Sequence, residues 1–441
     1  MDDGNWLIEP GWSVNPPVPT SDVTPGDKRV LRSLGERLAA IAALPAQEEA
    51  ASNWRALNGL RPVKPMVYTW IDQVPWHEMA AEELHLQTTG EWSRYHELKM
   101  RRLLYEWEHF PGDMVIEPAV YAPVVAHNTA FGITEKVDIA STDAENSVVS
   151  RHFHLQIRDE DDLEKIKMPV VTYDRVASDL QFQQMKEIFD GVIDVKKRGA
   201  NGLLLWFAPW DELIRWWGVQ EALTDLVDRP DLVHKAMEKL VNAYLHLLDQ
   251  FEEQDLLALN SSSYHIGSGG YGYTDELPSP GYDPGHVRAK DLWGSGAAQI
   301  FCTVSPRMHW EFALQYEVRW MSRFGLNYYG CCDPLHRKLG ILEKIPNLRK
   351  VSMNFAVNVD EAVAGMGNRY VFSYKPNPAV FAEGTWDLEG ARQELETVLG
   401  KAKAHGCVVE VIMKDVSTVR YQPERLWDWA RMADEVTRRY A

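Results

Sequence analysis

Short apolar runs alternate with longer segments of helical periodicity along most of the chain. Within these runs the apolar residues are largely continuous, a pattern typical of strands that are buried on both faces. Strands separated by helices pair in parallel through right-handed crossovers, and eight of them favour closure into a barrel. We therefore predict an α/β fold, a (β/α)8 TIM barrel, with an open doubly wound sheet as the alternative. The runs are residues 65–70, 114–117, 202–209, 256–260, 326–330, 350–354, 370–373 and 408–413.

The chain before the first run predicts an N-terminal extension. Residues 1–27 are rich in proline, which favours an extended arm, and residues 27–57 have the periodicity of an amphipathic helix. We therefore divide the chain into an arm with a helix at 1–60 and a barrel at 61–441.

Two long segments between the predicted elements lie where barrel enzymes build their sites. Residues 122–165 follow the second run, and the glycine-rich residues 261–298 follow the fourth. Both leave the carboxyl end of a predicted strand, and a loop of this length in a compact domain is usually a lid or a substrate loop.

The composition narrows the possible partners and the compartment. With 64 acidic and 46 basic residues the formal net charge is −18, which opposes binding to nucleic acid or to an anionic membrane. The basic cluster 196–198 is expected to be the solvated end of a helix. No apolar run approaches about 20 residues, no secretory signal is evident, and four scattered cysteines indicate a reducing compartment. We expect a cytoplasmic protein.

Polar residues gather where the predicted strands end, as an active site in a barrel requires. Strands end in polar loops in any protein, and Asp333 alone is well explained as a helix N-cap before Pro334. The candidates for acid, base or anchoring roles are Glu117, His265, Lys414 and Asp415. The candidates for binding a substrate are Trp210, Asp211, Asn260, Tyr264, Asn354 and Asn377.

The segment from Cys331 to His336 has the most distinctive chemistry. Cys332 and His336 are separated by three residues, and their thiolate and imidazole are suitable ligands for Zn²⁺. The alternative is that one cysteine of the pair fills the core and the other lines a pocket. Two ligands are fewer than a zinc site needs, so zinc stays a hypothesis.

Several segments, in order along the chain, resemble the uroporphyrinogen-decarboxylase-like superfamily. The resemblance covers about residues 60–441 and implies a (β/α)8 barrel. It does not extend to the haem-pathway decarboxylase, because residues 66–76 lack the arginine-rich motif that holds substrate carboxylates, although Glu117 is similar in position to its catalytic aspartate. The resembling segments are residues 158–169, 206–209, 223–233, 305–314 and 375–383.

The resemblance implies the corrinoid and zinc methyltransferase branch of that superfamily. Cys332 looks like the first cysteine of that branch's His-x-Cys motif, but Gly330 stands in place of the histidine, and Lys414-Asp415 stand where a second cysteine is expected. An altered zinc site built from Cys332 and His336, with His265 or Asp415, is what the resemblance implies here.

The first hypothesis is therefore a methyltransferase that demethylates a methoxylated or N-methylated small molecule onto a corrinoid protein. A high content of Trp and Tyr, 17 of each, is consistent with aromatic walls around a planar substrate. The second hypothesis is a lyase, a decarboxylase in which Lys414 fixes a carboxylate and Glu117 or Asp211 donates a proton. A barrel that binds a ligand without catalysis is the third.

Overall fold

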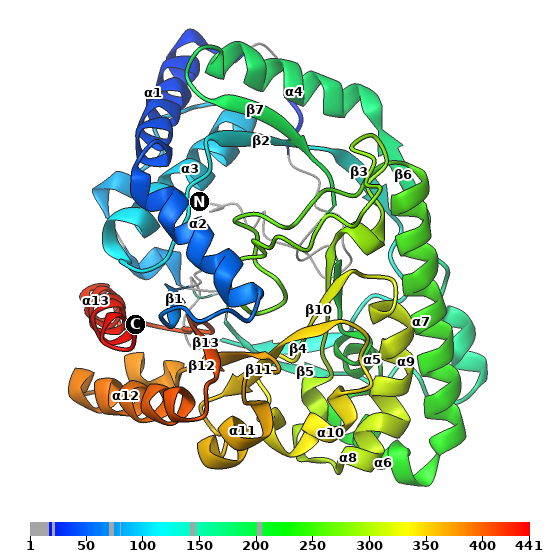
Figure 1. Ribbon diagram of the computed structural model, residues 1–441. Helices are drawn as coiled ribbons and strands as arrows, with labels where there is room; N and C mark the ends of the chain where they lie inside the picture. The colour runs from blue at the N-terminus through cyan, green and yellow to red at the C-terminus, as the bar shows by residue number, and fades with distance from the viewer. Residues whose placement is uncertain are drawn as a thin grey trace.

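A parallel seven-stranded sheet flanked by helices forms the centre of the computed structural model (Figure 1), so the prediction of an α/β fold is confirmed. The structure describes residues 17–19, 23–69, 75–79, 81–141, 146, 148–200 and 205–441. The order of the strands is β1-β13-β12-β11-β10-β9-β8. Their bounds are β1 Met66–Thr69, β8 Trp206–Phe207, β9 Trp293–Gly296, β10 Leu326–Tyr329, β11 Leu348–Asn354, β12 Val371–Lys375 and β13 Val408–Met413.

Three two-stranded ladders complete the described strands. β2 and β7 pair in parallel, whereas β3 with β6 and β4 with β5 form antiparallel pairs. Their bounds are β2 Ala119–Pro123, β3 Val125–Asn128, β4 Val137–Ala140, β5 Ser150–Phe153, β6 Val171–Asp174 and β7 Asp194–Arg198.

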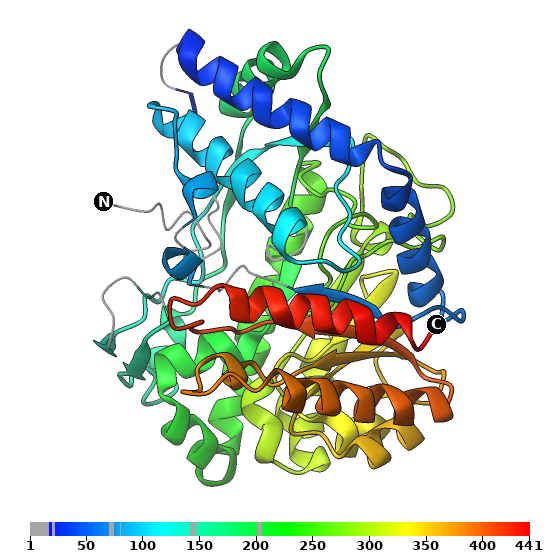
Figure 2. The same cartoon turned by 90° about the vertical axis from the view of Figure 1, so that its left-hand side faces the viewer.

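The helices surround the strands, and α12 and α13 lie side by side along one flank (Figures 1 and 2). The predicted helix at 27–57 is two helices, since Pro45 starts a new helix after a short turn. The α-helices are α1 Pro25–Ala42, α2 Pro45–Asn58, α3 Glu91–His109, α4 Arg175–Phe189, α5 Pro209–Trp217, α6 Val219–Asp228, α7 Pro230–Glu253, α8 Pro306–His309, α9 Gln315–Met321, α10 Leu339–Leu342, α11 Val359–Met366, α12 Leu388–Ala404 and α13 Glu424–Arg438.

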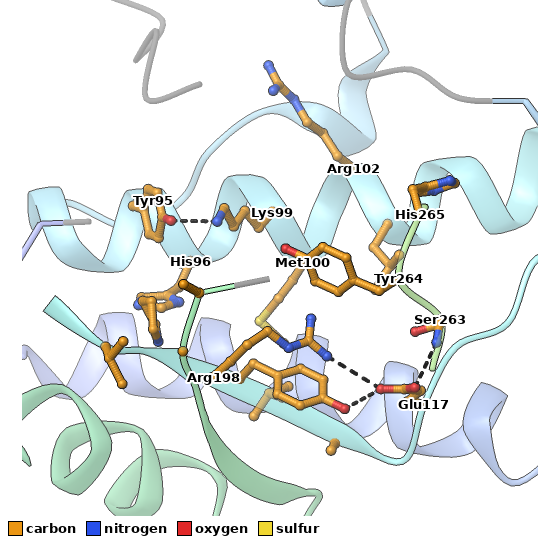
Figure 3. Close-up of a pocket in the computed structure, with 18 of the residues that line it drawn as sticks. Tyr95, His96, Lys99, Met100, Arg102, Glu117, Arg198, Ser263, Tyr264 and His265 are labelled. Atoms are coloured by element: carbon orange, nitrogen blue, oxygen red, sulfur yellow. Dashed lines mark hydrogen bonds and ion pairs between the residues drawn. The ribbon is translucent and has the colours of Figure 1, made fainter. Parts of the chain in front are cut away.

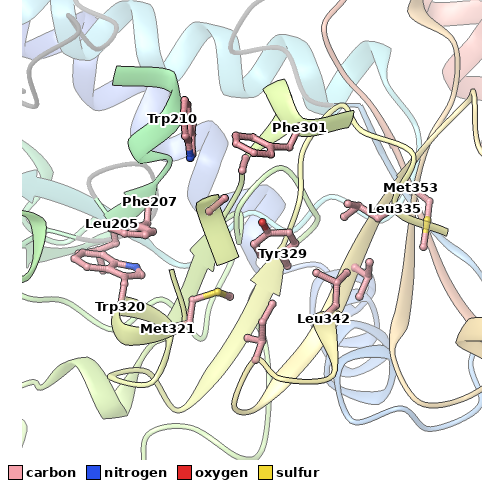
Figure 4. Packing of buried hydrophobic residues seen from close by; sticks show 14 of the residues in the cluster. Leu205, Phe207, Trp210, Phe301, Trp320, Met321, Tyr329, Leu335, Leu342 and Met353 are labelled. Carbon is pink, nitrogen blue, oxygen red and sulfur yellow. The ribbon is translucent and has the colours of Figure 1, made fainter. Parts of the chain in front are cut away.

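The two faces of the sheet carry different side chains. The outer face is apolar, with Val351, Phe372 and Val411 in the largest hydrophobic cluster, part of which is drawn in Figure 4. The strand registers place Lys350, Ser373 and Glu410 together on the inner face. Both faces are buried, as the continuous apolar runs predicted, but the inner face also holds charge.

A fully buried ion pair lies at the middle of the inner face. Lys350 Nζ is 2.9 Å from Glu410 Oε2, and neither side chain has any exposed surface. Ser373 Oγ donates to Glu410 Oε1 at 2.5 Å, so the carboxylate has partners for both oxygens. Although burial alone would raise it, the pKa of Glu410 is lowered by the charges of Lys350 and Lys375 and by these hydrogen bonds.

The glycine-rich loop predicted at 261–298 is anchored to this ion pair. Gly270 N donates to Glu410 Oε1 at 3.2 Å, and Lys350 Nζ donates to the carbonyl of Tyr271 at 3.3 Å. A Cβ atom on Gly270 would lie 2.3 Å from the ring of Trp54, so only glycine allows this approach. The loop therefore runs into the interior of the molecule instead of covering it as a lid.

The predicted eight-stranded ring differs from the observed sheet. In the described part of the chain no ladder joins the edge strands β1 and β8. The run 114–117 has no ladder partner, and β2 begins just after it. The run 256–260 forms only an isolated bridge, between Leu257 and Ala200. Residues 201–204 of the run 202–209, and residues 1–16 and 20–22 of the predicted arm, lie outside the described residues.

The strands β2 to β7 and β9 lie outside the predicted runs. β9 lies within the predicted loop at 261–298, and its two glycines hide the strand pattern. β7 contains the basic cluster 196–198, which was expected to end a helix; it pairs instead with β2.

Breaking the buried pair with Lys350→Met should lower the free energy of unfolding by about 3–5 kcal/mol, because the Glu410 carboxylate would lose its buried counter-ion. Urea unfolding measures this loss. Lys401→Met is the control, since Lys401 pairs with Asp360 on the surface, and it should cost less than about 1 kcal/mol. Equal losses for the two variants would show that the pair does not stabilise the fold.

Candidate functional site

The described residues line a cavity of about 550 Å³ on the side of the sheet next to β1. Its walls come from α3, β1, β2, β7 and the loop 263–271, and Figure 3 shows its centre. Aromatic rings form much of the lining: Tyr68, Trp76, Tyr95, Tyr121, Tyr264 and Tyr271. We call this the aromatic pocket. Its volume is in the range that accommodates a small-molecule ligand.

Glu117 is held as a carboxylate at one end of the aromatic pocket. It accepts hydrogen bonds from the hydroxyls of Tyr121 and Tyr273 and from Ser263 N, the last at 3.0 Å. Burial acts to raise its pKa, but these hydrogen bonds and the Arg198 charge outweigh it, so the pKa of Glu117 is lowered. Glu117 is therefore an acceptor and an anchor in this pocket, not a proton donor.

Three cationic side chains reach the pocket wall in a chain that is acidic overall. Arg198 lies 3.5 Å from Glu117 Oε2 (Figure 3). Its guanidinium lies over the ring of Tyr121. Lys99 Nζ donates to the hydroxyl of Tyr95 at 2.5 Å, and the Arg102 guanidinium stacks over Trp76. Aromatic faces suit a planar group, and cationic side chains suit a negatively charged substituent.

Two histidines also line the aromatic pocket. His265 contacts the ring of Tyr68 with a centroid distance of 4.6 Å, and its Nδ1 is 3.0 Å from the carbonyl of Gly269. Burial lowers the pKa of His96 to about 3, and the Lys99 charge acts in the same direction, so His96 is neutral. Its Nε2 has no hydrogen-bond partner among the described residues, and a ligand could use it.

Four residues that follow β10 and β13 form a second group, which we call the thiol–lysine cluster: Cys331, Cys332, Lys414 and Asp415. The two Sγ atoms are 3.5 Å apart, and Lys414 Nζ is 3.6 Å from the first and 3.3 Å from the second. Asp415 Oδ2 lies 2.5 Å from Lys414 Nζ and 3.0 Å from Cys332 Sγ. Cys331 is buried and Cys332 is exposed.

The charges in the thiol–lysine cluster favour one shared thiolate. The hydrogen bond from Cys332 lowers the pKa of Cys331 against the effect of burial, and Lys414 lowers it further. The pKa of Cys332 is raised, first by its hydrogen bond to Cys331, then by burial, and also because a second negative sulfur beside the first would be repelled. Burial opposes the charge of Lys414, yet the thiols and Asp415 raise its pKa, so Lys414 remains an ammonium.

Lys375 links the thiol–lysine cluster to the glycine-rich loop. Its Nζ donates to the hydroxyl of Tyr328 at 2.6 Å, and that hydroxyl is 2.9 Å from Ser268 Oγ in the loop. Burial lowers the pKa of Lys375 to about 7; the Glu410 charge opposes this, and the Lys414 charge adds to it. Sequence reasoning did not single out Lys375 as a site residue, although it ends a strand of the inner face.

The predicted candidates therefore divide into two groups. Glu117, Tyr264 and His265 line the aromatic pocket. Cys332, Lys414 and Asp415 are in mutual contact in the thiol–lysine cluster.

Other predicted binding residues have structural contacts instead. Trp210 is buried in the outer core and donates from Nε1 to the carbonyl of Phe312 at 2.9 Å. Asn260 is buried, and its amide exchanges two hydrogen bonds with the backbone of Trp293. Asn377 caps the short helix that begins at Pro378.

Asp211 and Asn354 also lie outside the lining of the aromatic pocket. Asp211 accepts from Gln299 Nε2 at 3.2 Å, and burial raises its pKa to about 6. Asn354 Nδ2 donates to the carbonyl of Cys332 at 2.7 Å, so it positions the thiol segment.

The predicted zinc ligands Cys332 and His336 are not gathered around a common point. His336 Nε2 faces Glu361 Oε2 at 3.8 Å, and burial lowers the pKa of the imidazole. Within the described chain, the one group of three ligand atoms close enough to share a metal ion is Glu83, Glu108 and His109, and it has no residue of either site. The Lys414 ammonium already lies among the donor atoms of the thiol–lysine cluster. The observed side chains do not fit the predicted zinc site.

Asp333, predicted as a helix N-cap, instead accepts a hydrogen bond from Cys331 N at 3.0 Å and so fixes the start of the thiol segment.

Sequence reasoning also missed a buried acid, Glu317, which lies against the outer face of the sheet. Glu317 Oε2 accepts from the hydroxyl of Tyr329 at 2.6 Å, and that hydroxyl is 2.7 Å from His309 Nε2. Burial raises the pKa of Glu317 to about 8, helped by the charges of Asp333 and Asp211, so the carboxyl is protonated at neutral pH.

No protein-family model matches this chain, and no curated protein matches it. Among solved structures, a methyltransferase from Methanosarcina mazei is similar over 88% of this chain and 98% of its own, with 11% sequence identity and a TM-score of 0.48. The function of the chain is therefore argued from its own side chains.

Among the described residues, none of the helices combines the length and apolar character that crossing a bilayer requires.

Replacing Glu317 by Gln should make stability less dependent on pH. The folded protein keeps a proton on Glu317 up to about pH 8, whereas the unfolded chain releases it near the ordinary carboxyl pKa, so wild-type stability falls as the pH rises between these values. The variant should gain about 1 kcal/mol on the wild type per pH unit over that interval. Urea unfolding across the neutral range measures the gain. The exposed Glu253→Gln is the control, and parallel curves for Glu317→Gln and the wild type would contradict the protonated state.

Proposed function

We propose that this chain is a methyltransferase that removes a methyl group from a methoxylated or N-methylated small molecule and passes it to a corrinoid protein. The observation that carries the proposal is that the aromatic pocket and the thiol–lysine cluster share the inner face of the sheet. Tyr68 of the pocket pairs in register with Ile412, and Lys414 lies two residues beyond Ile412 on the same face. Two residues along a strand are roughly 7 Å.

In this proposal the aromatic pocket binds and orients the methyl donor. The rings of Tyr68, Tyr264 and Tyr271 provide flat walls for a planar group. Arg198 and Lys99 provide positive charge for an acidic substituent on the same ligand. Fixing the donor in one orientation is the main contribution that such walls make to a displacement reaction.

The thiol–lysine cluster stabilises the group that departs when the methyl group leaves. Demethylation of an ether or amine leaves an oxygen or nitrogen that gains electron density, and a nearby ammonium stabilises that charge. Lys414 is a buried, protonated cation at the end of β13. A reduced corrinoid on a second protein supplies the nucleophile, and the residues of this chain hold the donor.

The proposal includes a barrel-like closure of the strands. Asp113 N, in the segment that precedes β2, donates to Val67 O of β1 at 2.9 Å. Ala200 N, just after β7, donates to Leu256 O at 2.6 Å. These contacts support a ring completed by irregular segments where ladders are absent.

A lyase is the second candidate, and the cations of the aromatic pocket favour it. Lys99, Arg102 and Arg198 are suited to a carboxylated ligand, which a decarboxylase would also bind. Glu117, however, is held ionised by its hydrogen bonds, so it is a poor proton donor for that reaction.

Methyl transfer is tested by mixing the purified chain with cob(I)alamin and a panel of methoxylated and N-methylated aromatic compounds. The expected result is the methylcobalamin absorption spectrum with at least one compound. Cys332→Ala and Lys414→Met should each slow its formation by about 100-fold, since each removes a charged or polar group beside the reacting centre. Cys302→Ser, which changes an exposed thiol away from the cluster, should have no effect. Release of CO₂ without methyl transfer would favour the lyase, and binding without either reaction would favour a binding protein.

The aromatic pocket is tested by ligand binding without turnover. Arg198→Met should weaken the binding of a methoxybenzoate by about tenfold, because a charge-assisted hydrogen bond is lost, and should change the binding of the uncharged methoxybenzene little. Lys197→Met is the matched control, since Lys197 is the neighbouring cation on β7 and pairs with Asp179 on the surface. Isothermal titration calorimetry measures the dissociation constants. Equal effects of the two variants would exclude a role of Arg198 in holding the ligand.

A further inference from the structure

We propose that the ammonium of Lys414 takes the place of a metal ion in the thiol–lysine cluster and holds the Cys331–Cys332 pair as a reactive thiolate. The inference deepens the proposed function, because it names what supplies positive charge at the same centre. It rests on contacts within the chain, and its test uses no methyl donor.

The donor atoms of the cluster point at the ammonium as ligands point at a cation. Lys414 Nζ has Cys332 Sγ at 3.3 Å, Cys331 Sγ at 3.6 Å and Asp415 Oδ2 at 2.5 Å. Only 6% of the Lys414 side chain is exposed, so solvent supplies few alternative partners. Two soft sulfur donors and a carboxylate would suit Zn²⁺, but here an ammonium lies among them.

A second lysine makes the position still less suitable for a divalent cation. Lys375 is also buried, and the charges of Cys331 and Cys332 act to raise its pKa against the effect of burial. A metal ion at the sulfurs would meet the positive charge of two buried lysines, and like charges in a protein interior repel one another. The same two lysines attract a thiolate.

Hydrogen bonds within the chain fix the backbone of the cysteine pair. Cys331 N donates to Asp333 Oδ1 at 3.0 Å, and the carbonyl of Cys331 accepts from Ser352 Oγ at 2.6 Å. The carbonyl of Cys332 accepts from Asn354 Nδ2 at 2.7 Å. Both thiols are therefore fixed toward Lys414, and the exposed Cys332 is the sulfur that a solute reaches first.

Alkylation by iodoacetamide at neutral pH tests the proposal. In this reaction a carbon–sulfur bond forms at the thiolate as iodide leaves, so its rate reports the population of thiolate that solvent can reach. Cys302, an exposed cysteine outside the cluster, is the internal standard. We expect the Cys331–Cys332 pair to react about tenfold faster than Cys302, because the Lys414 ammonium stabilises the one thiolate that the two sulfurs share. Peptide mass mapping identifies which cysteine carries the adduct.

Substitutions at Lys414 and at Asp415 should change this ratio in opposite directions. Lys414→Met should lower it about tenfold and Lys414→Arg should restore most of it, since only the cation matters for the thiolate. Asp415→Asn should raise it, because Asp415 competes for the ammonium and repels the thiolate. Asn is tolerated at this residue, whose φ is +59°. The Asp415→Asn arm keeps the test decisive if Lys414→Met does not fold.

Metal analysis of the full chain, purified with zinc present, completes the test. We expect far less than one zinc ion per chain. Stoichiometric zinc that is lost in Cys332→Ala and protects both thiols from iodoacetamide would overturn the proposal. So would equal reactivity of the Cys331–Cys332 pair and Cys302. Failure of methyl transfer with a fast-reacting Cys331–Cys332 pair would instead count against the proposed function and leave this inference standing.

Discussion

The buried ion pair between Lys350 and Glu410 is the interaction on which both candidate sites depend. A charge enclosed on all sides is tolerated only when a counter-ion and hydrogen bonds satisfy it, and here part of that satisfaction comes from the backbone of the glycine-rich loop. The same carboxylate faces Ser373, which also contacts Lys375 near the thiols. One carboxylate thus fixes the loop that carries His265 and the strand that carries Lys375.

This arrangement explains why the two faces of the sheet have different compositions. The outer face meets helices, and its side chains are apolar because helix packing excludes water without offering polar partners. The inner face meets a loop whose buried peptide groups need hydrogen-bond partners. The lysine, serine and glutamate side chains on that face therefore form hydrogen bonds instead of being buried without them. Catalytic chemistry is possible there because charged groups are already present and satisfied.

How far the sequence predicts the structure depends on how each segment is held. A long, largely apolar strand such as β13 is evident from its composition, since burial on both faces selects it. The run 256–260 is equally apolar but is fixed mainly by side chains such as that of Asn260, which no periodicity reveals. β7 is mostly exposed and charged, and Val195 is its one buried residue, so its sequence carries no apolar pattern.

The same contrast applies to the sites. Residues at strand ends, such as Cys332 and Lys414, could be grouped from sequence because parallel strands bring their carboxyl ends to one edge. His336 could not be placed, since its direction depends on the irregular turn after Pro334. The aromatic pocket and the thiol–lysine cluster come from different elements, the first mainly from α3, β2 and β7 and the second from β10 and β13. Substitutions in the walls can therefore change the shape of the aromatic pocket while the contacts of the thiol–lysine cluster stay intact, so the two can evolve separately.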